Sequence, residues 1–216
     1  RPALCLLGAE AVGGDPALAL STAAAIENFQ SAALIHDDIA DESELRRGEP
    51  CTYVTEGTGV AINVGDLGLS VVLGGVLSDE ALPAQTRLDV MGELYRMELR
   101  TIEGQALDLG WVRDGRWDIT PDDYLYMASH KTAYYSAAVP LVAGATVGGG
   151  SPEQRRALDG FGMAAASPSS CRTTSSTSWA THRSRARTSV PTSPRASARS
   201  SWSGRSRTWT GRGATS

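Results

Sequence analysis

The sequence predicts an all-α fold, and two observations support this expectation. Long stretches rich in Ala, Leu, Ile and Val contain few helix breakers, most clearly between Pro16 and Ile39. In addition, no apolar and polar residues alternate with a period of two, and no hairpin dipeptide stands out between apolar runs. A helical bundle with no substantial sheet is therefore expected.

The first half of the chain contains two long apolar helices. The residues after Pro2 read as a helix that is already under way, so further residues are expected upstream. Residues 16–39 form one long buried helix, because they are rich in good helix formers. Residues 41–50 are polar and include a glycine and a proline, which predicts a helix end followed by a loop. A second apolar helix is expected over residues 59–77.

The second half repeats this helical patterning. It resumes over residues 84–109 and pauses at the turn signal Asp114-Gly115. Thr120 can cap a new helix, which should then extend to residue 147. Glycines then interrupt the chain, and a further helix is expected over residues 153–165.

Charge divides the chain into two unlike segments. Residues 1–165 contain all 24 Asp and Glu, whereas residues 166–216 contain nine Arg and no acid. Only the first segment has enough aliphatic residues to bury a core. We therefore expect a partial helical domain over residues 1–165. Residues 166–216 should be a Ser-, Arg- and Thr-rich tail that is disordered or foreign to the fold.

Cysteine spacing and hydropathy argue against several classes of site. Cys5, Cys51 and Cys171 form no CxxC pair and no zinc-ligand spacing, so thiols in a reducing compartment are expected. We expect no apolar run to approach the roughly 18 to 20 residues that are needed to cross a bilayer. The start lacks a signal-peptide pattern. The sequence thus predicts a soluble, cytoplasmic protein without a membrane span.

An acidic motif ends the first long apolar helix. Asp37, Asp38 and Asp41 form a DDxxD pattern. At about 100° per residue, Asp37 and Asp41 lie one turn apart on one face, with Asp38 beside them. Carboxylates held this close repel each other unless a cation lies between them. An all-oxygen site of this kind suits Mg²⁺ that also takes phosphate oxygens. A solvated acidic helix terminus is the alternative reading of an isolated motif.

Arg46-Arg47-Gly48 follows the acidic motif and strengthens the magnesium reading. Two guanidinium groups beside metal-binding carboxylates are suited to a metal-bound diphosphate. The whole run from His36 to Pro50 resembles the first aspartate-rich motif of the trans-polyprenyl diphosphate synthases, which are class I isoprenoid synthases, including its trailing RRGxP.

Further matches to this family follow in order along the chain. Residues 61–66 read Ala-Ile-Asn-Val-Gly-Asp, residues 104–109 read Gly-Gln-Ala-Leu-Asp-Leu, and Lys131-Thr132 comes later. Arg1-Pro2 resembles the end of an upstream GKxxRP motif. Taken singly, each match has an ordinary structural explanation. Together and in order, they indicate a member of the family that is truncated at its N-terminus.

The resemblance implies a Mg²⁺-dependent prenyltransferase that condenses isopentenyl diphosphate with an allylic prenyl diphosphate. Asp37 and Asp41 would hold the metal, with Asp38 part of the catalytic motif. The substrate-binding residues implied by the motifs are Arg46 and Lys131 for the allylic diphosphate, Arg1, Gln30 and Arg47 for isopentenyl diphosphate, and Gln105, Asp108 and Thr132 along the pocket. The family also implies a homodimer, which nothing in the residues themselves indicates.

Side chains below the acidic motif predict the product length. In such enzymes the product grows along the helix that ends in DDxxD. Ala33 and Ala32 are small, which argues against a farnesyl-length stop, and Phe29, a further turn down, is large enough to block further growth. Geranylgeranyl diphosphate is therefore the expected product, and longer products remain open.

The tail lacks the second aspartate-rich motif that the family requires. Residues 166–216 contain 15 Ser and nine Thr but no Leu, Ile or Phe. Shifting the reading frame of Ala166–Trp179, with GC-rich codons, can produce an apolar segment with two adjacent aspartates. We interpret the tail as the result of a single-base loss near Ala165.

Three other functions remain open. The chain could be a non-catalytic helical subunit, or an inactive fragment, that supports an intact synthase. A terpene cyclase can use a similar aspartate motif, although Arg46-Arg47-Gly48 favours chain elongation. The arginine-rich tail could bind nucleic acid through its positive charge, but the frame change accounts better for its composition. Nucleic acid is therefore not expected as a partner.

Overall fold

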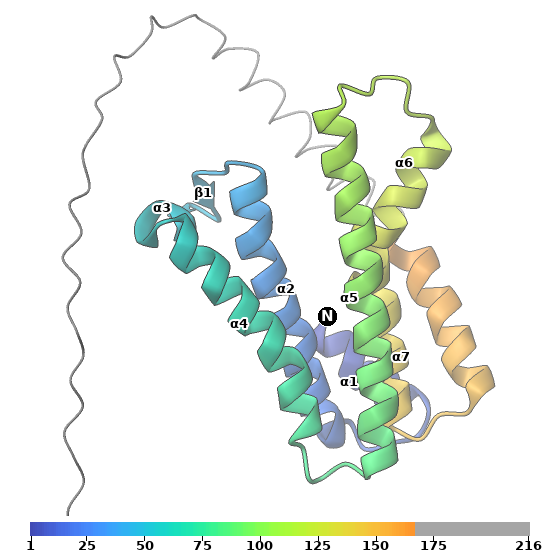
Figure 1. Ribbon diagram of the computed structural model, residues 1–216. Helices are drawn as coiled ribbons and strands as arrows, with labels where there is room; N and C mark the ends of the chain where they lie inside the picture. The colour runs from blue at the N-terminus through green and yellow to red at the C-terminus, as the bar shows by residue number, and fades with distance from the viewer. Residues whose placement is uncertain (167–216) are drawn as a thin grey trace, which may run out of the picture.

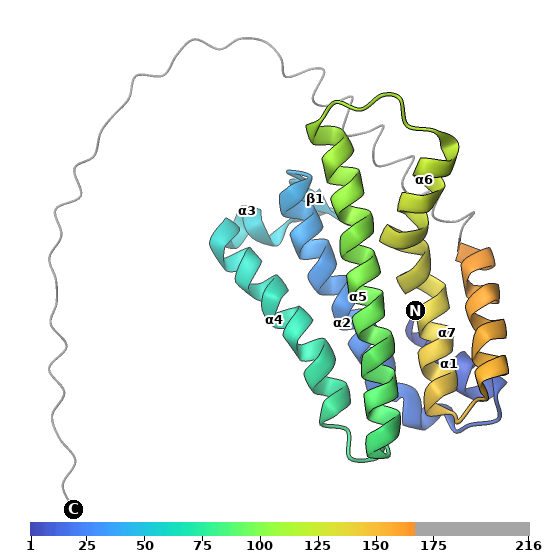
Figure 2. The same ribbon diagram turned by 45° about the vertical axis from the view of Figure 1, so that its right-hand side comes forward.

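The computed structural model describes residues 1–166, and these are almost entirely helical. The expected all-α fold is confirmed. Figures 1 and 2 show helices of different length standing side by side. The described elements are α1 Pro2–Ala11, η1 Pro16–Ala19, α2 Leu20–Ala40, β1 Leu45–Arg46, β2 Glu49–Pro50, α3 Thr52–Glu56, α4 Thr58–Leu77, α5 Ala84–Arg113, α6 Pro121–Ala128, η2 Ser129–Ala138, α7 Val139–Val147 and a helix over residues 152–166. Predictions about residues beyond 166 lie outside the described residues.

The core is centred on α7, whose nine residues are all buried. α1 approaches it so closely that side chains are excluded at the crossing. A Cβ atom on Gly8 would lie 2.2 Å from the Leu141 carbonyl oxygen, and one on Gly144 would lie 1.8 Å from the Cys5 carbonyl oxygen. Small residues therefore set the separation of these two helices.

The segment around α2 differs from the expected single helix at both ends. Residues Pro16–Ala19 form a 3₁₀ turn in which the Asp15 carboxylate accepts a hydrogen bond from the Ala17 N–H. This cap starts the helical turn at Pro16, and the α-helix itself begins at Leu20. After α2, the expected loop contains a two-residue antiparallel ladder. Arg47 and Gly48 turn the chain with positive φ angles of 56° and 90°, as a tight hairpin requires.

α6, η2 and α7 form one continuous helical rod where a single α-helix was expected. Its central ten residues, Ser129–Ala138, have π-helical hydrogen bonding. Pro140 follows directly and lacks an N–H donor, and its ring would crowd the carbonyl of Ser136 in a regular α-helix. The wider π turn relieves that conflict. The preceding helix, α5, extends to Arg113, four residues beyond its expected end.

The expectation that no apolar run approaches bilayer length is wrong. α4 spans 20 residues and is long and apolar enough to cross a membrane by length and composition. In the structure, α4 packs along α2 (Figure 1) and exposes most of its remaining surface. A helix of a soluble protein can pass the same test, so this property alone assigns no location.

Candidate active site

Three elements meet at the C-terminal end of α2 and bring the acidic motif next to residues far away in the sequence. α5 approaches η2 closely, because a Cβ atom on Gly104 would lie 2.3 Å from the Lys131 backbone nitrogen. This contact places Gln105 and Asp108 of α5 beside Lys131 and Asp37. The sequence matches at residues 37, 105, 108 and 131 therefore belong to one cluster.

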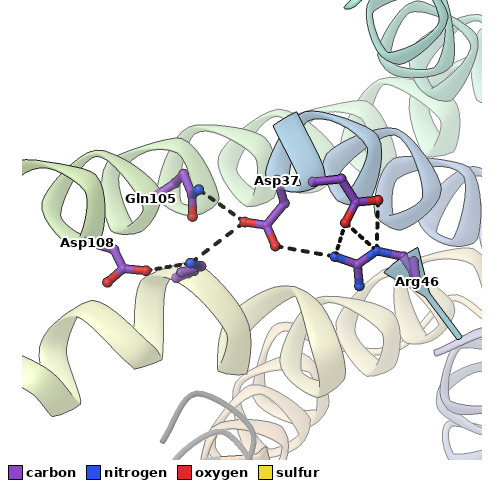
Figure 3. A network of polar contacts seen from close by, with 6 residues as sticks. Asp37, Arg46, Gln105 and Asp108 are labelled. Carbon is purple, nitrogen blue, oxygen red and sulfur yellow. Dashed lines mark hydrogen bonds and ion pairs between the residues drawn. The ribbon is translucent and has the colours of Figure 1, made fainter. Parts of the chain in front are cut away.

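Asp37 occupies the middle of this polar cluster, as Figure 3 shows. Its Oδ1 accepts a hydrogen bond of 3.1 Å from Gln105 Nε2 and lies 3.8 Å from Lys131 Nζ. Its Oδ2 lies 3.8 Å from an Arg46 guanidinium nitrogen. One carboxylate thus faces an amide and two cations that come from three different segments.

Lys131 is shared between two carboxylates. Its ammonium donates a 2.5 Å hydrogen bond to Asp108 Oδ2 and also faces Asp37. Burial opposes the charged form, but Asp108 and Asp37 outweigh it and raise the pKa of Lys131 above its usual value of 10.5. The lysine therefore carries a positive charge, which suits it to a polyanionic ligand.

Arg46 is held by Asp38, the most enclosed carboxylate of the motif. The Asp38 residue is only 4% exposed. Its oxygens accept hydrogen bonds from Arg46 Nε at 2.7 and 2.9 Å, and the guanidinium also approaches Oδ1 at 2.6 Å. This hydrogen bonding raises the pKa of Arg46 above its ordinary value. The Arg46 guanidinium is thus fully charged and fixed in direction.

Asp41 completes the acidic motif at the end of α2, where its N–H bonds to the Asp37 carbonyl. Burial, followed by the charge of Asp37, raises the pKa of the Asp41 carboxyl above its usual 3.8. A further cation near the motif would favour the charged form of Asp41.

The donor set fits a magnesium ion only together with a ligand. Among the described residues, no group of three or more His, Cys, Asp or Glu is arranged to hold a metal ion. Asp37 and Asp41 nevertheless supply carboxylate oxygens one helical turn apart. Mg²⁺ commonly takes one or two carboxylates and fills its remaining positions with water and phosphate oxygens. The residues present therefore fit a metal that arrives with a phosphate-containing ligand.

Arg1, at the start of α1, and Gln30, on α2, each carry a buried polar atom without a partner in the described part of the chain. Arg1 Nε and Gln30 Oε1 are buried and find no hydrogen-bond partner among the described residues. Buried polar atoms without partners are rare in folded proteins and often mark a ligand site. The Arg1 guanidinium also lies over the Tyr135 ring, 4.9 Å from its centroid.

Two expected substrate residues are not drawn into the polar cluster. Arg47 is exposed at the tip of the β1–β2 turn. Thr132 is partly buried on η2 next to Lys131. The structure thus separates Arg47 from its neighbour Arg46, which points into the cluster.

Two of the three residues expected to set product length share one face of α2, and the third lies against α4. Phe29 is buried and packs edge to face against Tyr135, with ring centroids 5.8 Å apart. Ala32 is buried against α4, where a Cβ on Gly68 would lie 2.8 Å from the Ala32 Cβ. Ala33 is partly buried one turn from Phe29, so it shares that residue's face.

Sequence reasoning missed Tyr135, which contacts both Arg1 and Phe29. Its position four residues after Lys131 was an available signal, since that spacing is about one helical turn. It also missed the pairing of Asp38 with Arg46, because nothing in the spacing shows which aspartate the loop folds back to.

Comparisons with known proteins identify the relatives of this chain. The family model described as polyprenyl synthetase matches residues 1–166. A short chain isoprenyl diphosphate synthase from Methanothermobacter thermautotrophicus is 41% identical over 162 residues, which cover 75% of this chain and 48% of the relative. A (2E,6E)-farnesyl diphosphate synthase from Mycobacterium bovis is 35% identical over 162 residues, 75% of this chain and 44% of the relative.

A solved structure shows the same fold. The geranylgeranyl pyrophosphate synthetase from Pyrococcus horikoshii superposes with a TM-score of 0.73 at 33% sequence identity. The match covers 77% of this chain and 50% of that one. The chain therefore spans about half the length of the relatives it matches.

Proposed function

Because this chain belongs to the polyprenyl synthetase family, a family of prenyltransferases, we propose that it condenses isopentenyl diphosphate with an allylic prenyl diphosphate. The C–O bond to the allylic diphosphate breaks, and the isopentenyl double bond attacks the resulting carbocation. A new C–C bond forms and a proton is lost. The observation that carries this proposal is the cluster in which Arg46 and Lys131 flank Asp37.

Arg46 and Lys131 are proposed to bind the departing diphosphate. Both are cations held in place by carboxylates, Arg46 by Asp38 and Lys131 by Asp108. Preorganised charges of this kind stabilise negative charge that develops on a leaving group. Gln105 and Asp108 both lie on α5. Gln105 bonds to Asp37 on α2, and Asp108 bonds to Lys131 on η2, so α5 links the two sides of the site.

Asp37 and Asp41 would hold Mg²⁺ in this proposal. The bound metal would neutralise charge on the departing diphosphate. In the structure, Asp37 already faces Arg46, Lys131 and Gln105. A diphosphate that engages these two cations would leave the Asp37 oxygens available to the metal.

Isopentenyl diphosphate is assigned to Arg1 and Gln30, because the buried Arg1 Nε–H has no partner within residues 1–166 and can donate to a diphosphate oxygen. Gln30 would donate through its amide nitrogen. Arg47 could approach that diphosphate from the exposed hairpin turn. Thr132 is proposed to line the pocket between the two substrates. The relatives are named for products of different chain length. Geranylgeranyl diphosphate as the product is therefore a proposal that rests on Phe29, Ala32 and Ala33.

The test combines turnover and binding on the purified full chain. Product formation from isopentenyl and farnesyl diphosphates is measured with and without Mg²⁺, and pyrophosphate binding is measured by calorimetry. Turnover that requires Mg²⁺ and is lost in Asp37→Asn supports the enzyme. Absence of both turnover and pyrophosphate binding would contradict the proposal.

A non-catalytic helical subunit that supports an intact synthase is the second candidate, and it differs from the enzyme in lacking turnover. In that case the chain would bind pyrophosphate without turning over substrate. Adding an intact synthase would then produce a complex that co-elutes during gel filtration.

The reading of residues 166–216 as a frame-shifted segment remains a proposal. The family match ends at residue 166, which is consistent with it. Resequencing the coding DNA around Ala165 tests it, and a sequence with no plausible frame change would contradict it. Cytoplasmic location and the absence of nucleic acid as a partner remain predictions.

A further inference from the structure

We propose that Asp38 is a positioning residue that aims Arg46 at the diphosphate and is not itself a metal ligand. This inference rests on the proposed function, because it assigns the direction of Arg46 to the binding of a diphosphate. The three aspartates of one short motif would then have two different tasks.

The first argument is the geometry of the Asp38–Arg46 pair. Arg46 offers the edge formed by Nε and one terminal nitrogen to Asp38, with contacts of 2.6 to 2.9 Å. A guanidinium has five N–H donors in a rigid plane. Engagement of one edge therefore fixes the plane and leaves the other N–H groups free to meet phosphate oxygens. The same guanidinium lies 3.8 Å from Asp37, at the centre of the cluster.

The second argument is that Asp38 differs from the other two aspartates in burial. Its side chain is 6% exposed, compared with 24% for Asp37. Both Asp38 oxygens already accept hydrogen bonds from Arg46. Asp38 also lies about 100° around the helix from Asp37. A metal on Asp38 would have to approach a nearly enclosed carboxylate whose two oxygens Arg46 already engages.

The third argument comes from the loop that carries Arg46. The Ser43 N–H bonds to the Asp38 carbonyl at 2.9 Å, and the Cys51 N–H bonds to the Glu44 carbonyl at 3.0 Å. The hairpin is therefore tied to the end of α2 by backbone as well as side-chain contacts. Its other arginine, Arg47, is exposed at the turn. The Asp38 carboxylate is thus what distinguishes the two neighbouring arginines.

A double-mutant cycle tests this assignment. Binding of inorganic pyrophosphate to the full chain is measured by calorimetry in the presence of Mg²⁺ for Asp38→Asn, Arg46→Met and the double variant. Hydrogen bonds to charged groups are strong enough that each single change should weaken binding about tenfold or more. If Asp38 acts only through Arg46, the double variant should bind like Arg46→Met alone. The change Glu56→Gln, at an exposed position at the end of α3, is the matched control and should leave affinity near that of the wild type.

The magnesium dependence separates positioning from metal ligation. In Asp38→Asn, the Mg²⁺ concentration that gives half-maximal pyrophosphate binding should be unchanged, whereas in Asp41→Asn it should rise. If Asp38→Asn changes the half-maximal Mg²⁺ concentration, and does so also when Arg46 is Met, the assignment is overturned. Additive losses in the double variant would also overturn it.

A ligand-free measurement keeps the inference testable if the wild-type chain binds no pyrophosphate. That result would contradict the proposed function, but the Arg46 Nε–H signal can still be followed by NMR. The signal should exchange slowly with water in the wild type and quickly in Asp38→Asn. Equally fast exchange in both proteins would show that Asp38 does not hold Arg46.

Discussion

Lys131 illustrates how one side chain links the parts of the candidate site. Its ammonium bonds to Asp108 on α5 and faces Asp37 on α2, while its own backbone packs against Gly104. The lysine is charged despite its burial, because the two carboxylates raise its pKa. Loss of that charge would leave two partly buried carboxylates without their shared cation.

Replacing Lys131 by Met should therefore weaken pyrophosphate binding by about tenfold or more, because a charge-assisted hydrogen bond to phosphate is lost. Lys131→Arg keeps the charge and should retain more of the affinity. Calorimetry on the full chain measures both variants. Wild-type affinity in Lys131→Met would remove this residue from the proposed site.

The burial of Cys5 predicts that the free energy of unfolding falls at alkaline pH. Cys5 is fully buried beside α7, and burial raises the pKa of its thiol to about 12 from a usual value of 9.0. In the unfolded chain the thiol ionises near pH 9.0. The folded state favours the neutral thiol, and its contribution to stability is fully present below pH 9.0. It is lost as the pH rises toward about 12. The loss amounts to at most about 4 kcal/mol.

Chemical unfolding at a series of pH values measures this effect. The free energy of unfolding should fall over that alkaline range, and part of the fall should be absent in Cys5→Ala. An identical pH profile in the two proteins would show that another group is responsible. Comparison with Cys5→Ala is essential, since tyrosines also titrate at high pH.

The acidic motif could be located from spacing, but the partners of its members could not. Asp37 and Asp41 share a helical face, which the period of the helix predicts directly. The pairing of Asp38 with Arg46 depends on how the hairpin folds back, and a tight turn with positive φ at Arg47 is not evident from the residue types.

The separation between α5 and η2 decides whether the site forms. Gly104 lets the two backbones meet, and the next residues of α5 then reach the cluster. Gly110 lies on the same helix, and a Cβ atom there would contact nothing within 4 Å. The two glycines therefore provide a matched pair of substitutions.

Gly104→Ala should destabilise the protein by about 1–3 kcal/mol or more, because the new methyl group would overlap the Lys131 backbone. It should also weaken pyrophosphate binding, since Lys131 would move away from Asp108 and Asp37. Gly110→Ala should instead stabilise the protein by about 0.4–1 kcal/mol. Thermal unfolding and calorimetry measure both, and similar effects in the two variants would contradict the importance of this contact.

Helix positions were predictable because apolar periodicity is local, and α4 matches its expectation within one residue. The irregular turns were not predictable in the same way. The 3₁₀ start before α2 follows from a cap by Asp15, and the π segment accommodates Pro140 within a packed rod. Both depend on hydrogen bonding that propensity alone does not describe.

The bundle as a whole exposes two apolar stripes on α4 and α5. Their members recur at helical spacing, as expected for faces that pack against another helix. The stripes consist of Val60, Val64, Leu67 and Val71 on α4 and of Leu88, Tyr95, Leu99 and Ile102 on α5. Exposed apolar surface of this kind supports the homodimer proposed from the family resemblance.

Leu67→Glu should therefore weaken self-association by at least about tenfold, because a charge would be buried at the interface. Leu125→Glu alters an exposed leucine on α6 outside both stripes and serves as the control. Sedimentation velocity at several concentrations measures the assembly. A wild-type chain that stays monomeric at all concentrations would contradict the dimer.

The residue order determined the helical class of the protein, the position of most helices and the family, because periodicity, helix propensity and the DDxxD and RRG motifs are local properties. The tertiary structure decided which charges meet. Asp37 faces Lys131 and Gln105 only because Gly104 lets α5 approach η2. Asp38 holds Arg46 only because a two-residue turn reverses the chain. Contacts between distant segments depend on how helices pack, and packing is a property of the assembled bundle.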